Sequence, residues 1–164
     1  MVRAQGGIPD EQLVGDVAGA ARYLTAMGSS NGKVATIGYC SGGRQSFLAA
    51  CSLTLDAAVD CYGAFVVTPP PEGAPLKVGP IAHLAEHLSC PLLGLFGVED
   101  QNPSPAETAE LEAILSAQHK TFEFHTFDGA GHAFFATNRP NYRPEAALEG
   151  WKLIWDFFGR HLSG

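Results

Sequence analysis

Hydrophobic positions along the chain follow a helical period in some segments and form short continuous runs in others. The first helical segment has one apolar face, made of Leu13, Val17, Ala20, Ala21 and Leu24, and Gly28 is placed to end it. Short apolar runs predict strands over residues 34–39, 57–63, 91–97 and 121–127. Helices are expected from Ser41 to about Ser52 and, as a short one, around residues 81–88.

Two later helices have stronger signals. Ser104, Pro105 and Glu107 form an N-terminal capping signature, which predicts a helix to about Gln118. The last helix is amphipathic, with an apolar stripe of Leu148, Trp151, Trp155, Phe158 and Leu162. Strands that alternate with crossover helices predict an α/β fold, a three-layer α/β/α sandwich around a mostly parallel sheet. The 164 residues are the length of one domain, so we expect residues 1–164 to fold as a single unit.

Composition and charge narrow the possible partners. Apolar residues make up 46% and charged residues 16%, which is typical of a globular protein and excludes disorder. The net charge of −7 and the scattered basic residues exclude a nucleic-acid partner. No apolar run has membrane-spanning length and the first residues lack a hydrophobic signal core, so we expect no membrane partner and a cytoplasmic location.

The four cysteines are spaced at intervals of 11, 10 and 29 residues, without a CxxC pair or a nearby histidine couple. This spacing predicts neither a zinc site nor a disulfide framework. Cys51, Cys61 and Cys90 are expected to be small buried side chains in a reducing compartment. Cys40 differs, because it lies in GYCSGG, between a predicted strand and a predicted helix.

A nucleophile at a sharp turn from strand to helix is lifted out of the sheet edge, and small neighbours are needed because the backbone there is crowded. Gly38 and Gly42 match this G-x-nucleophile-x-G spacing around Cys40, with sulfur in place of the usual hydroxyl. The helix that follows directs its positive N-terminal end at the sulfur, which favours thiolate over thiol. Cys40 is therefore a candidate nucleophile.

Partners for such a nucleophile follow in the chain. His132 lies in GAGHAF just after the last predicted strand, where glycines let a loop bring the imidazole over the sheet edge. Asp100 follows the preceding strand directly and is the preferred carboxylate to hold the imidazole in one tautomer. Its neighbour Glu99 is the alternative, because only geometry can decide between adjacent residues. Asp128 is expected to cap the turn that leads to His132.

Three stretches, GYCSGG, CPLLGLFGVED, and FDGAGHAFF followed by RPNYRPEAALEGWKLIWDFF, resemble the dienelactone hydrolase family of α/β-hydrolases. The resemblance covers nearly the whole chain from about residue 16, with the motifs in the family order. It implies an ester or lactone hydrolase in which Cys40 attacks the carbonyl and forms an acyl-thioester, His132 moves the proton and Asp100 orients it. It implies no cofactor and no metal, because side chains and water suffice.

The chain departs from the family in two ways. Members that open dienelactones have an arginine four residues after the histidine, where this chain has Ala136; Arg139 and Arg143 lie in the same loop and could hold a carboxylate instead, although loop charges are more often solvated. Members also begin with several strands that this chain does not contain, so we expect a truncated α/β-hydrolase fold. The Ser41 N–H is then one oxyanion donor without its usual second, which predicts a weak catalyst.

Two other functions stay open. One is a catalytically weak or inactive remnant that acts by binding or association, and the other is a thiol redox protein that uses Cys40, although no resolving cysteine is near in sequence. For the hydrolase, Tyr39 and Phe134 are candidates for the pocket wall around a small ester or lactone. Because residues 34–39 would lie at an open sheet edge without proline or charge, we also expect a homo-oligomer.

Overall fold

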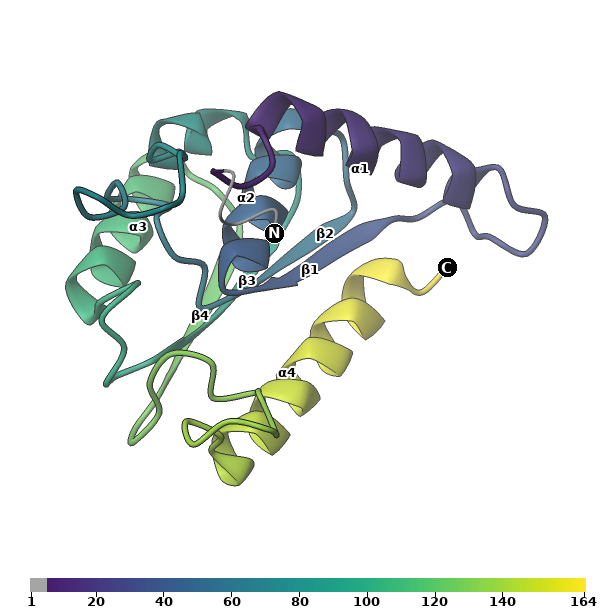
Figure 1. Ribbon diagram of the computed structural model, residues 1–164. Coiled ribbons are helices and arrows are strands. Elements are labelled where there is room, and N and C mark those ends of the chain that lie inside the picture. The colour runs from purple at the N-terminus through teal and green to yellow at the C-terminus, as the bar shows by residue number, and fades with distance from the viewer. Residues whose placement is uncertain (1–5) are drawn as a thin grey trace.

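The computed structural model describes residues 6–164, and its centre is a four-stranded sheet (Figure 1). The strands are β1 (Ala35–Tyr39), β2 (Ala57–Cys61), β3 (Leu92–Gly97) and β4 (Phe122–Phe127), and they lie side by side in that order. Every neighbouring pair is parallel. The predicted parallel sheet is therefore confirmed, and all four strands point their carboxyl ends to the same edge.

Helices cover both faces of the sheet. On one side lie α1 (Asp10–Thr25), α2 (Ser41–Ser52), α3 (Pro105–Ala117) and a short 3₁₀ helix, η2 (Ala82–His87), while α4 (Pro144–Leu162) lies on the other (Figure 1). Because each parallel strand is joined to the next by a crossover, helices cover the faces of the sheet, and its two central strands become fully buried. The predicted three-layer architecture is confirmed.

Each face of the sheet packs its own core. On the α2 side the core includes Phe47, Leu92 and Leu115, whereas on the α4 side it includes Val59 and Phe157. Successive residues of a strand point to opposite faces, so neighbouring positions of one strand serve different cores. Every residue of β2 and β3 is buried as a result.

Several predicted element ends differ from the structure, and the strand predicted over residues 57–63 already ends at Cys61. The first helix ends at Thr25, so Gly28 lies beyond it, and Leu24 is 46% exposed because the last turn of α1 extends past the core. The first strand begins at Ala35, one residue late, since the Val34 N–H donates to the Asp56 carboxylate at 2.8 Å. The capping box at the start of α3 is confirmed.

The apolar stripe predicted along α4 is confirmed only in part, because Phe158 and Leu162 are half-buried against the core on the α4 side while the other three residues are exposed. Leu148 and Trp155 are more than 60% exposed and Trp151 is 40% exposed. The residues of α4 that are buried are instead Ala146, Ala147, Gly150, Ile154 and Phe157. Small residues let the helix axis approach the sheet closely, so the bulky stripe is turned to the side. No helix within residues 6–164 has the length and apolar character needed to cross a bilayer.

Candidate active site

Cys40 lies at the turn between β1 and α2 and has a backbone φ of 58°, a left-handed conformation that is rare for residues other than glycine. The turn is held by hydrogen bonds: the Cys40 N–H donates to the Cys61 carbonyl at 3.0 Å, and the Gly43 N–H donates to the Cys40 carbonyl at 2.9 Å. A Cβ at Gly38 would overlap the Gly42 carbonyl, which explains why glycine is needed two residues before the cysteine.

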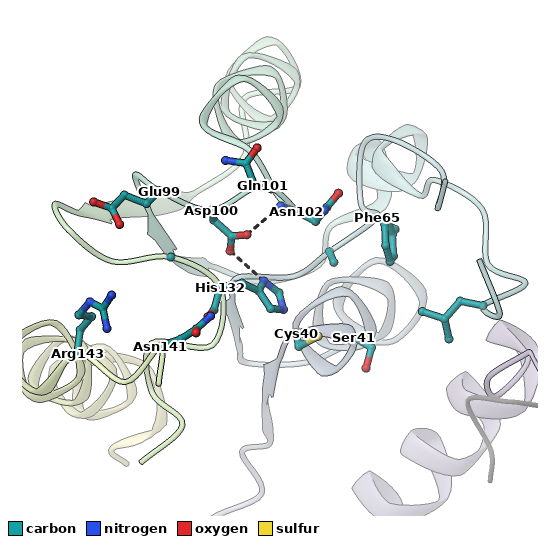
Figure 2. A pocket seen from close by; sticks show the side chains of 13 residues that line it. Cys40, Ser41, Phe65, Glu99, Asp100, Gln101, Asn102, His132, Asn141 and Arg143 are labelled. Atoms are coloured by element: carbon teal, nitrogen blue, oxygen red, sulfur yellow. Dashed lines mark hydrogen bonds and ion pairs between the residues drawn. The ribbon is translucent and has the colours of Figure 1, made fainter. Parts of the chain in front are cut away.

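Asp100 follows β3 and is only 1% exposed. One of its oxygens, Oδ2, lies 2.9 Å from His132 Nδ1, while Oδ1 accepts a hydrogen bond from the Asn102 N–H at 2.8 Å. The neighbouring Glu99 is exposed, and its side chain points away from His132 (Figure 2). Of the two acidic candidates, the structure therefore brings Asp100 to the imidazole.

The loop that carries His132 is held by residues further along the chain. Asn141 Nδ2 donates to the His132 carbonyl at 3.0 Å, and Arg143 Nε donates to the Gly129 carbonyl at 2.9 Å. Sequence reasoning did not find Asn141, because an asparagine in a polar loop has no distinguishing pattern. The Tyr62 ring also lies edge-on to the imidazole, with 5.1 Å between the ring centres. These contacts fix where the imidazole can lie.

The charge state of His132 depends on its two partners. Its pKa is raised to about 9, first by the hydrogen bond to Asp100 and then by one to Cys40. An imidazole that keeps its proton beside a sulfur favours the thiolate. The buried cysteines behave differently, because burial raises the pKa of the Cys51 thiol to about 12 and that of Cys90 to about 11. Within this fold, Cys40 has the setting of a nucleophile.

A pocket of about 470 Å³ opens over Cys40 and His132 (Figure 2). Its polar wall includes Asp100, Asn141 and Arg143, and its other side includes Phe65 and Leu76. Ser41 also lines the pocket, and as the first residue of α2 it has a backbone N–H without an acceptor inside the helix. A carbonyl carbon held at the sulfur would therefore have its oxygen near the N-terminal end of α2.

The two aromatic residues expected to touch substrate, Tyr39 and Phe134, do not line this pocket. Phe134 is completely buried and packs against Tyr62 and Phe127. Tyr39 faces Phe135 instead, with 5.4 Å between the ring centres. Both expectations are corrected, because side chains next to the strand ends turn inward to complete the core on the α4 side.

The basic residues of the His132 loop lie in different places. Arg143 lines the pocket, where its guanidinium donates to three backbone carbonyl oxygens, those of Gly129, Pro140 and Tyr142. Arg139 is exposed and does not line it. Among residues 6–164, no three His, Cys, Asp or Glu side chains lie together as ligands of a metal ion would.

Comparison with known proteins places the chain in a family. Residues 4–162 match the model of the dienelactone hydrolase family. Two relatives named "Putative carboxymethylenebutenolidase", from Methylorubrum extorquens and Yersinia pestis, are 33% and 36% identical over 156 residues. These alignments cover 94% of this chain but 52% and 57% of the relatives, so the chain spans about half of their length.

The crystal structure titled "Putative Dienelactone Hydrolase" from Klebsiella pneumoniae superposes on this chain with a TM-score of 0.81. The two chains share 29% sequence identity, and the superposition covers 93% of this chain and 62% of the other. The sheet, its flanking helices and the order of the elements are thus those of a known α/β-hydrolase architecture.

Proposed function

The chain belongs to the dienelactone hydrolase family, and from that membership we propose that it cleaves a carboxylic ester or lactone with Cys40 as nucleophile, His132 as proton carrier and Asp100 as the residue that orients His132. The observation that supports this most is the buried Asp100 carboxylate, 2.9 Å from His132 Nδ1, together with the hydrogen bond between His132 and Cys40. Nothing in this chemistry requires a metal or cofactor.

In the first half of the reaction, the Cys40 thiolate attacks the ester carbonyl carbon. The carbonyl π electrons move to oxygen, and the Ser41 N–H donates to the resulting oxyanion. When the intermediate collapses, the bond to the alcohol oxygen breaks and the protonated His132 gives its proton to that oxygen. The acyl group remains on the Cys40 sulfur as a thioester. The alcohol of an ester is released, whereas the hydroxyl freed from a lactone stays attached to the acyl group.

In the second half, the now neutral His132 takes a proton from water while the water oxygen attacks the thioester carbon. Collapse of this intermediate breaks the carbon–sulfur bond, restores the Cys40 thiolate beside the protonated imidazole and releases the carboxylic acid. Asp100 keeps Nδ1 protonated throughout, so that Nε2 is the atom that exchanges the proton.

Hydrolysis of p-nitrophenyl acetate by wild type and by Cys40→Ala tests the proposal. We expect a wild-type rate above background and a Cys40→Ala rate at background, because the thioester cannot form. Mass spectrometry of quenched wild-type protein should show an acetyl group on Cys40. Equal rates for the two proteins would remove the hydrolase and favour the alternative, a catalytically weak or inactive member of the family that acts by binding or association.

We further propose that the chain associates with a second copy through the open edge of β1. This strand pairs with β2 on one side, and its sequence ATIGY contains neither proline nor charge. Ile37 on this edge is 39% exposed. Exposed apolar side chains lie near this edge on both sides of the sheet, Leu24 of α1 and Met27 just after it on one side, and Trp151 and Trp155 of α4 on the other. Pairing with a second copy would satisfy the backbone groups and cover these side chains.

Sedimentation at micromolar concentration tests this association, with an Ile37→Lys variant as the matched protein. A charged side chain on the edge should convert an oligomer of the wild type into a monomer. A monomeric wild type with the β1 amides protected from hydrogen exchange would contradict it. We propose a cytoplasmic location as well, since Cys51, Cys61 and Cys90 are buried as free thiols, as expected in a reducing compartment.

A further inference from the structure

A second pocket, of about 250 Å³, lies beside the one over Cys40. The two share four wall residues, Ser41, Ala64, Phe65 and Leu76. The second pocket therefore begins at the residue next to the nucleophile and continues over the first turns of α2 toward the start of α1. None of the residues of the proposed reaction except Ser41 lines it, so its role is separate from the chemistry.

Six of the ten residues that line the second pocket are apolar or glycine, and the other four are Asp10, Ser41, Arg44 and Gln45. In addition to the shared residues, Ile8 and Val78 line it, and both are half-buried. At its far end lies Arg44, which is 3% exposed. Asp10 neutralises this charge with two hydrogen bonds, at 2.7 and 2.8 Å, and the Gly79 carbonyl accepts a third at 2.7 Å. The Arg44 charge is thus paired, and of its guanidinium nitrogens only Nε has no acceptor among the described residues, so the pocket offers an anionic ligand no unpaired charge.

The two sides of Cys40 thus differ in chemistry. Figure 2 shows Asn141 and Arg143 on the His132 side of the sulfur, whereas Ser41 and Phe65 lie on the opposite side. The first side is polar, and the second leads into the apolar pocket.

The reaction itself decides which part of an ester lies on which side. His132 must protonate the oxygen of the leaving alcohol, so the alcohol lies on the polar side, next to the imidazole. The carbonyl carbon is bonded to Cys40 and its oxygen lies near the Ser41 N–H. The remaining substituent of the carbonyl carbon, the acyl arm, must then extend away from His132, past Ser41 and Phe65.

We propose that the second pocket is the acyl subsite, and that it selects esters whose acyl arm is uncharged and apolar. This inference rests on the proposed hydrolase function, because the reaction assigns the acyl arm its direction. The substrate class is then an ester of a short to medium-length apolar acid with a polar alcohol portion.

A series of p-nitrophenyl esters from acetate to octanoate measures the subsite in the wild-type protein. Burial of one methylene contributes about 0.8 kcal/mol, so kcat/KM should rise roughly fourfold per added methylene until the pocket is full. A flat or falling profile from acetate to hexanoate would overturn the proposal.

The variant Val78→Trp fills the pocket with a large ring at a residue that lines only this pocket. We expect the ratio of kcat/KM for hexanoate to that for acetate to fall at least tenfold, and Ile8→Trp should do the same from the opposite wall. Val98→Trp is the matched control, because Val98 is 43% exposed and lines neither pocket, so the ratio should stay within twofold of wild type. An unchanged ratio in both pocket variants would reject the subsite.

Alkylation of Cys40 tests the subsite without relying on ester hydrolysis. Iodoacetamides with N-methyl to N-hexyl arms react with the sulfur without a hydrolytic step. We expect Cys40 to be alkylated faster as the arm lengthens, and Val78→Trp to remove this trend. If no ester is turned over in a Cys40-dependent way, the hydrolase proposal fails while this trend alone supports the pocket. If turnover depends on Cys40 but neither series responds to arm length, only the subsite fails.

Discussion

Two regions of the molecule differ in backbone conformation and in the kinds of side chain they contain. The first, here termed the rim, consists of the loops that follow β1 to β4; the second, the packed interior, consists of the two cores on the faces of the sheet. Within residues 6–164 five residues other than glycine have positive φ, and four of them, Cys40, Tyr62, Phe65 and Ala133, belong to the rim. Most residues of the interior lie in helices or strands, and their side chains are apolar, from alanine to phenylalanine; Tyr62, which is buried in the core on the α4 side, belongs to both regions.

The difference shows where strain and charge are tolerated. A left-handed residue costs on the order of 1–2 kcal/mol, and it persists only where the surroundings fix it. At the rim, these conformations aim Cys40 and Phe65 into the pocket. The interior supplies the stability that offsets this cost, through close packing on both sheet faces. The following predictions test this division, starting with the largest effect.

The largest effect is expected at the rim, from Asp100→Asn. An amide at this position cannot hold the protonated imidazole or fix its tautomer, so any esterase rate should fall by roughly 10³–10⁴-fold. Glu99→Gln is the matched control, because that side chain points away from His132 (Figure 2) and the rate should change by less than about threefold. Steady-state kinetics with p-nitrophenyl acetate measures both. A larger loss in Glu99→Gln would assign the orienting role to Glu99.

Thiol labelling compares the two regions directly. Burial raises the pKa of Cys51 to about 12 and that of Cys90 to about 11, and it raises the pKa of Cys61 further, while Cys40 lies beside the protonated His132. Iodoacetamide at pH 7.5 should therefore label Cys40 at least a hundredfold faster than the others. Peptide mapping after timed quenching gives the four rates. A faster interior cysteine in the folded protein would contradict the assignment.

Asp60 is a carboxyl group enclosed by the packed interior. It is 1% exposed, its Oδ1 accepts from the Gly63 N–H at 2.7 Å, and burial raises its pKa to about 7. Since the folded pKa lies above the unfolded value of about 3.9, the charged form is disfavoured in the fold. Its contribution to stability is therefore fully present below about pH 4 and is lost as the pH rises to about 7.

The variant Asp60→Asn should remove this pH dependence. From pH 4.5 to pH 8, wild type should lose about 2–4 kcal/mol of unfolding free energy relative to the variant. The difference between the folded and the unfolded pKa of Asp60 sets this magnitude. Urea unfolding of both proteins at several pH values measures the difference. Parallel curves for the two proteins would show that Asp60 keeps its ordinary pKa in the fold.

The smallest effect concerns the strain at the rim. Ala133 has a φ of 65°, so Ala133→Gly should relieve the strained backbone and raise the free energy of unfolding by about 0.5 kcal/mol, after the entropy that glycine adds to the unfolded chain. Ala49→Gly, in the completely buried part of α2, should instead lower it by about 1–2 kcal/mol. Thermal unfolding of the two variants measures the sign of each change in the free energy of unfolding. A destabilised Ala133→Gly would mean that the backbone at residue 133 is unstrained.

Local patterns determined much of the fold. The strand runs, the helix after Cys40 and the capping box at Ser104 are signals within a few residues, and each was confirmed. The sequence also predicts that Cys40, Asp100 and His132 lie at the same edge of the sheet, because residues in the loops that follow parallel strands lie at the carboxyl edge. Such inferences need only the direction of the chain.

The tertiary structure decided what depends on distance and on the direction of side chains. It chose Asp100 over Glu99, turned Phe134 into the core, and placed Asn141 behind His132. It buried the face of α4 that carries Ala146, Ala147, Gly150, Ile154 and Phe157, where the small residues of the first turns let the helix approach closely, and left Leu148 and Trp155 exposed. The second pocket joins residues 8, 44 and 78, which are far apart in sequence, so only folding could bring them together. The spacing of apolar residues along the chain specifies which helices and strands form, whereas packing between distant segments specifies which side chains meet.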